Sequence, residues 1–213
     1  PDASGVDLTG SRIRSVASGT GGCKRIAVFS GSGKIRIPAS GCNINSSDNL
    51  YQQLYPTGTW GKKYLTDPSK NNPYNYYRVT KNNPSASVYV NGSLVPASSF
   101  INNTYYQFFN NRPNEIVSDQ PVSVAQYFTT QGCDGNSNTV PYDPDMIVLN
   151  PVEQNINNVT LVNSNLFAPA TNQYPHQHHI HVIMKNGGSG ISSFQLDGTS
   201  VSSSLWTVHP SDP

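Results

Sequence analysis

Apolar and polar residues alternate with a period of two in many short segments of this chain, and turn residues separate those segments. Such alternation sends successive side chains to opposite faces of a strand, whereas a helix would repeat apolar residues at i, i+3 and i+4. Helical repeats of this kind are rare here. The sequence therefore predicts an all-β, antiparallel β-sandwich with strands at 25–30, 34–38, 76–80, 87–90, 105–109, 122–128, 146–149, 158–162, 178–185 and 193–196.

Two dipeptides, Asn91-Gly92 and Asp197-Gly198, each follow an alternating apolar run. Both favour the positive φ angles of a two-residue hairpin turn. The sequences around them, 87–95 and 193–201, resemble each other, and their separation matches the size of one β-sandwich unit. We therefore expect two related sandwich lobes, at 1–130 and 140–213.

Two further segments give local predictions. Gly31-Ser32-Gly33-Lys34 superficially resembles a phosphate loop, but the lysine is followed by Ile35 rather than Ser or Thr. The segment is therefore interpreted as a hairpin turn. A short amphipathic helix is expected at 47–55, where Leu50 and Leu54 have helical spacing and a serine precedes them as a cap.

Composition excludes several classes of partner. Charged residues make up 12% of the chain, against roughly 25% in ordinary globular proteins. The net charge is +1, and Lys and Arg form no block, so neither nucleic acid nor an anionic membrane is expected as a partner. No apolar run approaches the roughly 20 residues that span a bilayer, so direct membrane insertion is not expected. A surface rich in Asn and Ser is common in extracellular β proteins.

The chain has three cysteines, Cys23, Cys42 and Cys133. An odd count allows at most one internal disulfide bond. The two pairings considered are Cys23 with Cys42, which would close a loop over one hairpin, and Cys42 with Cys133. The remaining thiol would be free or would pair outside this sequence.

Tyrosines interleaved with asparagines suggest a ligand surface. Aromatic rings can stack on a glycan or a peptide while neighbouring amides form hydrogen bonds around it. Arg78 is interpreted either as a ligand anchor or as an interior partner of Glu153 or Asp119. The candidate ligand-binding residues are Tyr74, Tyr76, Tyr77, Tyr105 and Tyr106.

A loop with alternating oxygen ligands is a candidate calcium site. Asp134, Asn136 and Asn138 fall at i, i+2 and i+4, and Asp143 and Asp145 follow. Such side chains suit Ca²⁺ in a flexible loop, although the Gly and Glu that an EF-hand requires are missing. The alternative is that these side chains only satisfy turn backbone groups. Ca²⁺ is the one cofactor that the sequence suggests.

Histidines cluster at His176, His178, His179 and His181. In a strand, His179 and His181 would share one face, as a metal site requires, but a further ligand would have to come from elsewhere. The alternative without a metal is a polar strand edge that faces solvent. No Gly-x-Ser-x-Gly elbow or Cys-His pair is apparent, so no catalytic residue is assigned and an enzyme is not expected.

Six short segments occur in a characteristic order along the chain: 23–31, 48–54, 60–64, 120–127, 142–146 and 150–154. Together they resemble the IgGFc-binding protein N-terminal domain family. The resemblance covers the chain from about Cys23 and is closest to a bacterial branch in large secreted surface proteins of gliding, type IX-secreting bacteria. It implies that Trp60 fills a core, that Gly61 allows a tight bend, and that the domain continues beyond Pro213.

The resulting functional hypothesis is a non-catalytic, extracellular module of a large cell-surface protein that acts in adhesion or ligand recognition. Its partners would be a glycan or protein ligand and the neighbouring domains of the same polypeptide. One alternative is a structural spacer without a ligand of its own. The other is a metal-dependent hydrolase, which requires His179 and His181 to converge with a carboxylate.

Overall fold

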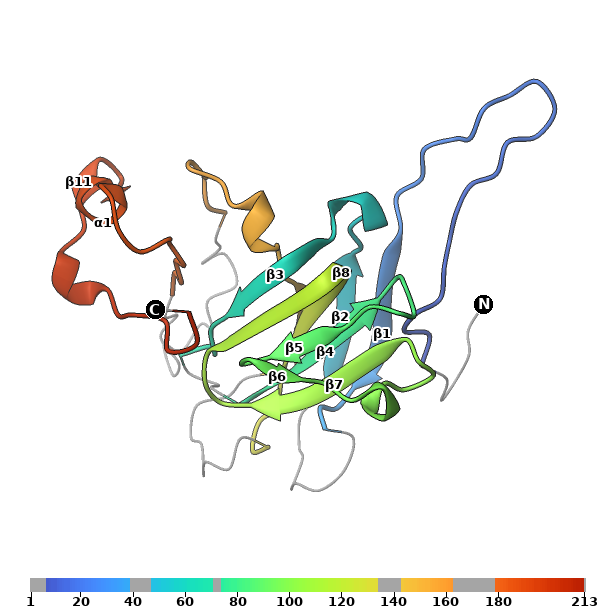
Figure 1. Ribbon diagram of the computed structural model, residues 1–213, viewed down its shortest axis with the longest axis horizontal. Coiled ribbons are helices and arrows are strands. Elements are labelled where there is room, and N and C mark those ends of the chain that lie inside the picture. The colour runs from blue at the N-terminus through green and yellow to red at the C-terminus, as the bar shows by residue number, and fades with distance from the viewer. Residues whose placement is uncertain (1–6, 39–46, 71–73, 134–142, 163–178, 213) are drawn as a thin grey trace, which may run out of the picture.

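The fold is all-β with antiparallel sheets, as the sequence predicts. The computed structural model describes residues 7–38, 47–70, 74–133, 143–162 and 179–212 (Figure 1). The strands are β1 (Phe29–Ile35), β2 (Asp48–Gln53), β3 (Gly61–Thr66), β4 (Asn75–Lys81), β5 (Val88–Val90), β6 (Ser93–Leu94), β7 (Tyr105–Asn110), β8 (Asn114–Phe128), β9 (Met146–Val148), β10 (Gln195–Leu196) and β11 (Thr199–Ser200). The helical turns are η1 (Thr57–Thr59), η2 (Ala97–Ser99), η3 (Val152–Gln154), α1 (Gly190–Ser193) and η4 (Ser203–Leu205).

The long strand β8 organises the main, seven-stranded sheet. Its first part pairs with β5 on one side and β3 on the other, and its second part pairs with β4 and β9. The partners change around the exposed residues 119–121, which include Pro121. Because proline cannot donate a ladder hydrogen bond, this corner is a suitable place for a strand to change partners. β8 therefore belongs to two groups of strands.

The principal core lies between these two groups. Tyr64 of β3 and Ile116 of the first part of β8 pack with Val79 of β4 and with Val122 and Val124 of the second part of β8. All five side chains are buried. Alternation in β4 and β8 sends these residues to one face, so the period-two pattern of the sequence produces the core directly.

The opposite face of β4 and β8 is covered by other segments. Leu50 of β2 and Met146 of β9 form a second buried cluster, with Tyr76 and Tyr127 packed against it. The N-terminal segment covers the same face through Asp7, which pairs with Arg78 of β4 at 2.9 Å. The partner of Arg78 is thus Asp7, and neither Glu153 nor Asp119, because the N-terminal segment folds back over the sheet.

Both predicted two-residue hairpins are confirmed. Asn91 and Gly92 connect β5 to β6 with φ angles of 49° and 77°, and Asp197 and Gly198 connect β10 to β11 with 51° and 76°. The two hairpins differ in their surroundings, because β5 belongs to the main sheet while β10 and β11 form a separate two-stranded sheet.

The helix predicted at 47–55 is wrong, because these residues form β2 and pair with β1. Leu50 is buried, but Leu54 is 38% exposed, so the helical spacing of the two leucines does not correspond to a buried face. The turn predicted at Gly31–Lys34 is also wrong. Those residues lie inside β1, where the register shifts between Ser32 and Ile35 and Lys34 has a positive φ.

Other expected strands differ in extent. Residues 158–162, and 179–185 of the expected strand 178–185, have no regular strand structure, and part of 193–196 belongs to α1. The strand β3 was not predicted, because its sequence Gly-Lys-Lys-Tyr-Leu-Thr has little apolar alternation. Its pairing with β8 holds it in the sheet.

The division into lobes at 1–130 and 140–213 stays a prediction. In the structure, β9 from the second range is hydrogen-bonded to β8 from the first. Near the C-terminus, Asp212 pairs with Lys63 of β3 at 2.8 Å, and this contact raises the pKa of Lys63. The two ranges are thus joined by backbone and side-chain contacts. Among the described residues, no helix has the length and apolar character needed to cross a membrane.

Candidate functional site

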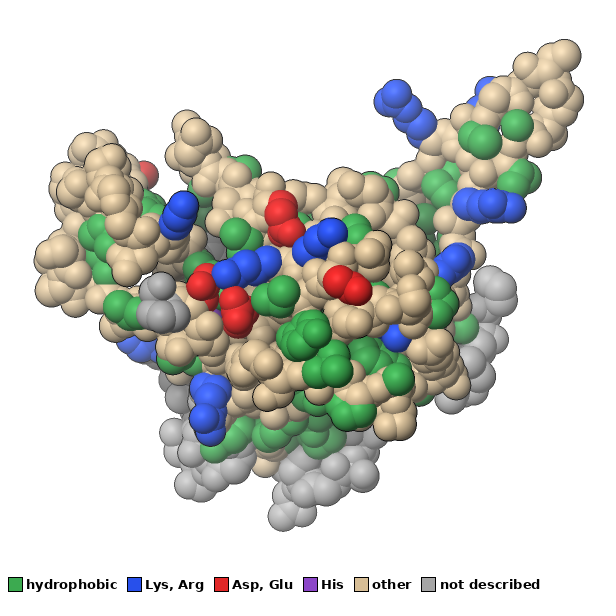
Figure 2. Space-filling model, viewed as in Figure 1, with side chains coloured by type: hydrophobic (Ala, Val, Ile, Leu, Met, Phe, Trp, Pro, Cys, Tyr) green, Lys and Arg blue, Asp and Glu red, His purple; other side chains and the backbone are tan. Residues whose placement is uncertain are grey.

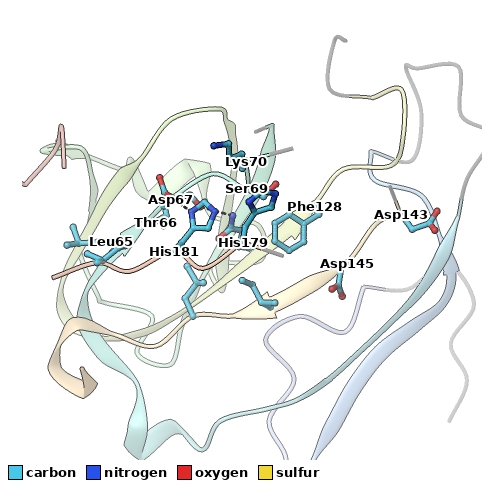
Figure 3. Close-up of a pocket in the computed structure, with 14 residues that line it drawn as sticks. Leu65, Thr66, Asp67, Ser69, Lys70, Phe128, Asp143, Asp145, His179 and His181 are labelled. Carbon is cyan, nitrogen blue, oxygen red and sulfur yellow. Dashed lines mark hydrogen bonds and ion pairs between the residues drawn. The ribbon is translucent and has the colours of Figure 1, made fainter. Parts of the chain in front are cut away.

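A cleft of about 600 Å³ opens where β3 ends (Figure 3). One wall is formed by residues from the end of β3 to Lys70, a second by β8 and β9, and a third by residues 179–183. The volume lies within the range of small-ligand pockets, roughly 300–1,000 Å³. The apolar lining is Leu65, Phe128, Ile147, Leu149 and Ile183, and the polar lining is Thr66, Asp67, Ser69, Lys70, Gln126, Asp143, Asp145, His179 and His181.

The floor of the cleft is held by buried amide side chains. Gln126 donates hydrogen bonds from Nε2 to Asn75 Oδ1 at 2.7 Å and to the Asp67 carbonyl at 3.2 Å. Thr66 Oγ1 accepts hydrogen bonds from both nitrogens of Asn114 at 3.1 Å. Since buried polar groups with partners are rigid, this network fixes the end of β3 relative to β8.

His181 Nδ1 contacts the Asp67 carboxylate, and both residues line the cleft. This contact joins the 179–183 segment to the residues that follow β3. Figure 3 shows His179 beside His181 on this side of the cleft, while Asp143 and Asp145 lie farther along. The cleft thus combines apolar walls with imidazole and carboxylate groups at its edge.

The histidine hypothesis is met only in part. His179 and His181 line the same cleft, and His181 contacts a carboxylate, but within the described residues no three His, Cys, Asp or Glu side chains are arranged to hold a metal ion. His176 and His178 lie outside the described residues. The described residues by themselves therefore supply no metal centre for a hydrolase.

Three of the five calcium candidates, Asp134, Asn136 and Asn138, also lie outside the described residues. Asp143 and Asp145 are exposed, and Asp145 Oδ1 accepts a hydrogen bond from the backbone N–H of Met146 at 2.7 Å. This contact is typical of an aspartate that satisfies a local backbone group. Calcium binding stays a prediction.

The predicted aromatic surface is largely packed inside the protein. Tyr77 is fully buried, and burial raises its pKa to about 12. Tyr105 is 6% exposed, lies over the Arg78 guanidinium at 4.4 Å, and donates a hydrogen bond from its hydroxyl to Asp7 at 3.0 Å. Tyr106 stacks on Phe108 in the principal core at 5.6 Å. These three rings therefore do not form the expected exposed patch.

A smaller aromatic cluster remains partly exposed on the face of β4 that carries Tyr76. Phe109 is 44% exposed, Tyr74 stacks on it at 5.4 Å, and Tyr76 lies 4.7 Å away. Tyr76 and Tyr77 are adjacent in β4, so their rings point to opposite faces. Period-two alternation would therefore have excluded a patch that contains both residues.

Two of the three cysteines lie among the described residues, and their states differ. Cys23 is an exposed free thiol, whereas Cys133 is disulfide-bonded. The pairing of Cys23 with Cys42 is therefore not formed, because Cys23 lies in a segment that projects into solvent. Cys42 lies outside the described residues.

The residues that position the cleft were missed by the sequence interpretation. Leu65 and Asp67 lie at the end of β3 and Gln126 lies in β8, so no spacing in the sequence marks the three residues as one site. The signal that was available is the order of short segments along the chain. Two of these segments, 60–64 and 150–154, meet in space beside the cleft: Glu153 Oε1 accepts a hydrogen bond from the Lys62 N–H at 2.7 Å, and Pro151 covers Gly61.

Trp60, expected to fill a core, is half-buried, and its indole N–H donates to the Tyr55 carbonyl at 3.3 Å. Neighbouring Gly61 is buried, and its lack of a side chain is what admits Pro151. The 60–64 segment thus serves the framework, as the resemblance implied, although Trp60 contributes less buried surface than expected.

A comparison with family models identifies the family of this chain. The family model described as IgGFc binding protein matches residues 3–213. Searches of curated proteins and of solved structures found no match. The model covers nearly the whole sequence, including the segments that meet beside the cleft. The chain therefore belongs to the IgGFc binding protein family.

Proposed function

We propose that this protein is a non-catalytic, extracellular recognition module, and that the cleft beside β3 binds its ligand. The observation that carries the proposal is the cleft itself, where apolar walls meet a small set of fixed polar groups. This combination is typical of binding sites. Membership in a family described as a binding protein supports the same role.

The composition of the cleft favours a protein ligand over a glycan. Glycan sites rely on exposed aromatic rings, and three of the five tyrosines considered for that task are packed in the interior. The cleft instead offers Leu65, Ile147 and Leu149 as an apolar surface with carboxylates at its edge. An extended peptide with apolar and basic side chains fits this chemistry.

The setting that we propose is a large cell-surface protein of a gliding, type IX-secreting bacterium, in which the module contributes to adhesion. Repeated display of weak sites along such a protein would raise the overall avidity. Ca²⁺ at Asp143 and Asp145, with loop residues 134–138, would neutralise the carboxylates at the edge of the cleft and weaken binding of a basic ligand.

A structural spacer is the second candidate function. It is favoured by the dense packing of Tyr77, Tyr105 and Tyr106, which leaves little exposed aromatic surface. A spacer would bind neighbouring domains of the same polypeptide but no separate ligand. The cleft distinguishes the two functions, because a spacer has no need of it.

The test is a binding screen of the purified chain against arrays of host proteins and glycans, in calcium and in chelator. Ile147→Arg places a charged side chain in the cleft, and Ile156→Arg makes the same change at a position that is 69% exposed and does not line the cleft. We expect a hit that Ile147→Arg abolishes and Ile156→Arg preserves. A hit that is equally strong for both variants would place the ligand elsewhere, and no hit under any condition would favour the spacer.

A further inference from the structure

Residues 11–28 form a projecting arm, and none of them lines the cleft. In Figure 1 the arm extends from the body on the side away from the C-terminal segment. Its two limbs run side by side, since Ser15 Oγ donates a hydrogen bond to the Lys24 carbonyl and the Gly21 N–H donates to Ser18 at the tip. Its base is anchored by Arg12, which bonds the Asn82 carbonyl, and by Val28, whose carbonyl accepts from the Leu54 N–H.

The arm concentrates positive charge. The N-terminal part of the chain from residue 8 to residue 47 contains no Asp or Glu, although the net charge of the whole chain is only +1. Arg12, Arg14, Lys24 and Arg25 all lie on the arm and are exposed. Figure 2 shows Lys and Arg side chains along it. The small net charge is therefore the sum of a basic arm and a body in which acidic residues outnumber basic ones.

Apolar side chains alternate with these charges. Ile13 and Val16 are each 66% exposed and Ile26 is 53% exposed. A partner surface that carried only acidic groups would leave these apolar side chains exposed to water. Exposed apolar residues on an extended, mostly unpaired backbone are typical of a segment that docks on another protein surface.

The cleft has the complementary chemistry. Its edge carries Asp143 and Asp145, together with Asp67 in contact with His181, against a single lysine, Lys70, and its apolar walls suit aliphatic side chains. The arm cannot reach the cleft of its own chain, because residues 179–183, which form one wall, lie on the far side of the body (Figure 1). A second copy of the chain supplies both surfaces.

We propose that the arm of one copy docks into the cleft of a second copy, giving a head-to-tail assembly. The inference rests on the proposed function, because it assigns a partner to the same cleft. The contact is heterologous: each docked copy still has a free arm or a free cleft, so the assembly grows as an open chain. Basic side chains pair with the carboxylates, and Ile13, Val16 and Ile26 cover the apolar walls.

The experiment is sedimentation velocity over a concentration series at low and high salt, in chelator, on the full chain. All proteins carry Cys23→Ser, so that an intermolecular disulfide cannot produce dimers. The arm variant is Arg14→Ser/Lys24→Ser/Arg25→Ser. The control is Lys62→Ser/Arg112→Ser/Lys185→Ser, which removes the same charge from exposed positions outside the arm and the cleft. The cleft variant is Asp143→Asn/Asp145→Asn, which keeps side-chain shape.

We expect the parent protein and the control to form oligomers whose size grows with concentration and falls with salt. The arm variant and the cleft variant should each associate at least about tenfold more weakly than the parent protein. Mixed together, the two variants should form a one-to-one complex that does not grow, because only one intact arm and one intact cleft remain. Such complementation distinguishes docking from nonspecific aggregation.

Three results would overturn the inference: a parent protein that stays monomeric up to about 1 mM at low salt, an arm variant that associates like the control, or mixed variants that do not combine. The ligand screen is repeated with the arm variant, whose cleft is intact. A ligand bound by that variant while the parent stays monomeric would refute the assembly and leave the proposed function standing.

Discussion

Gly61 shows how a single residue permits the contact between two distant segments. An added Cβ would lie 2.2 Å from Pro151 Cβ and 2.6 Å from Glu153 Oε2, which is closer than any real contact. The need at this position is therefore space and not an unusual φ angle. A tight approach of this kind cannot be read from the sequence around residue 61.

Gly61→Ala is expected to destabilise the protein by about 2 kcal/mol, because it overpacks a buried contact. The measurement is urea unfolding followed by fluorescence. Gly58→Ala is the matched control, since a Cβ at that position meets no atom within 4 Å. Equal stability of the two variants would show that the 150–154 segment is not held against β3.

Asp7 links the N-terminal segment to the sheet. Burial opposes its charge, but hydrogen bonds from Thr9, the charge of Arg78 and the hydroxyl of Tyr105 together lower the pKa of Asp7 below its ordinary value of 3.8. A lowered folded-state pKa means that ionised Asp7 stabilises the fold above pH 3.8. This contribution is lost as the pH falls through the lowered value.

Asp7→Asn should therefore reduce the free energy of unfolding by about 0.5 kcal/mol at pH 7, a typical value for a partly exposed ion pair. The difference from the unmodified protein should disappear under strongly acidic conditions, where Asp7 is protonated in both states. Unfolding curves at several pH values test this. A difference that persists unchanged at the lowest pH would show that the ion pair with Arg78 is not its source.

At the scale of elements, the corner of β8 depends on a side chain from β3. Tyr64 donates a hydrogen bond from its hydroxyl to the Val122 carbonyl at 2.6 Å and accepts one from the Gly61 N–H at 3.1 Å. The ring is 1% exposed, and burial raises its pKa to about 12. One hydroxyl thus ties β3 to the place where β8 changes partners.

Tyr64→Phe keeps the ring but leaves a buried N–H and a buried carbonyl without this partner. We expect a loss of about 1–3 kcal/mol in the free energy of unfolding. Tyr89→Phe, at a ring that is 38% exposed, should change stability very little. Thermal unfolding of both variants is the measurement, and a similar small effect in both would mean that water replaces the Tyr64 contact.

At the scale of the whole molecule, residues on either side of the predicted lobe boundary share one sheet. β9 pairs with β8, and η3 lies against β3 through Glu153. The arm and the cleft occupy different parts of the same body, which separates positive from negative charge over the molecule. The stability of the fold thus depends on contacts between the two sequence ranges.

Ending the chain after residue 142 should remove β9 and η3 and expose one edge of β8, whereas ending it after residue 162 keeps both elements. We expect the shorter chain to lose cooperative unfolding and to aggregate, because it exposes an unpaired strand edge and the apolar surface that Met146 covers in the full chain. The longer chain should stay folded. Circular dichroism and hydrogen exchange report the outcome, and an equally cooperative short chain would support two independent lobes.

The sequence by itself determined the strand class and two of the turns. Alternation in β4 and β8 predicts the core face because side-chain direction in a strand depends only on the position along it. Asn91-Gly92 and Asp197-Gly198 form hairpins because their positive φ angles are a local preference. The family resemblance likewise follows from the order of short segments, and the family model covers nearly the whole chain.

The tertiary structure alone decided which strands pair and which side chains meet. β2 takes strand structure in place of helix because β1 supplies backbone partners, and Tyr77 and Tyr105 are buried because other segments cover both faces of β4. The cleft, the Asp7 contact and the projecting basic arm each join residues far apart in sequence. Pairing and burial depend on partners that local preference does not specify, so these features emerge only when the whole chain is folded.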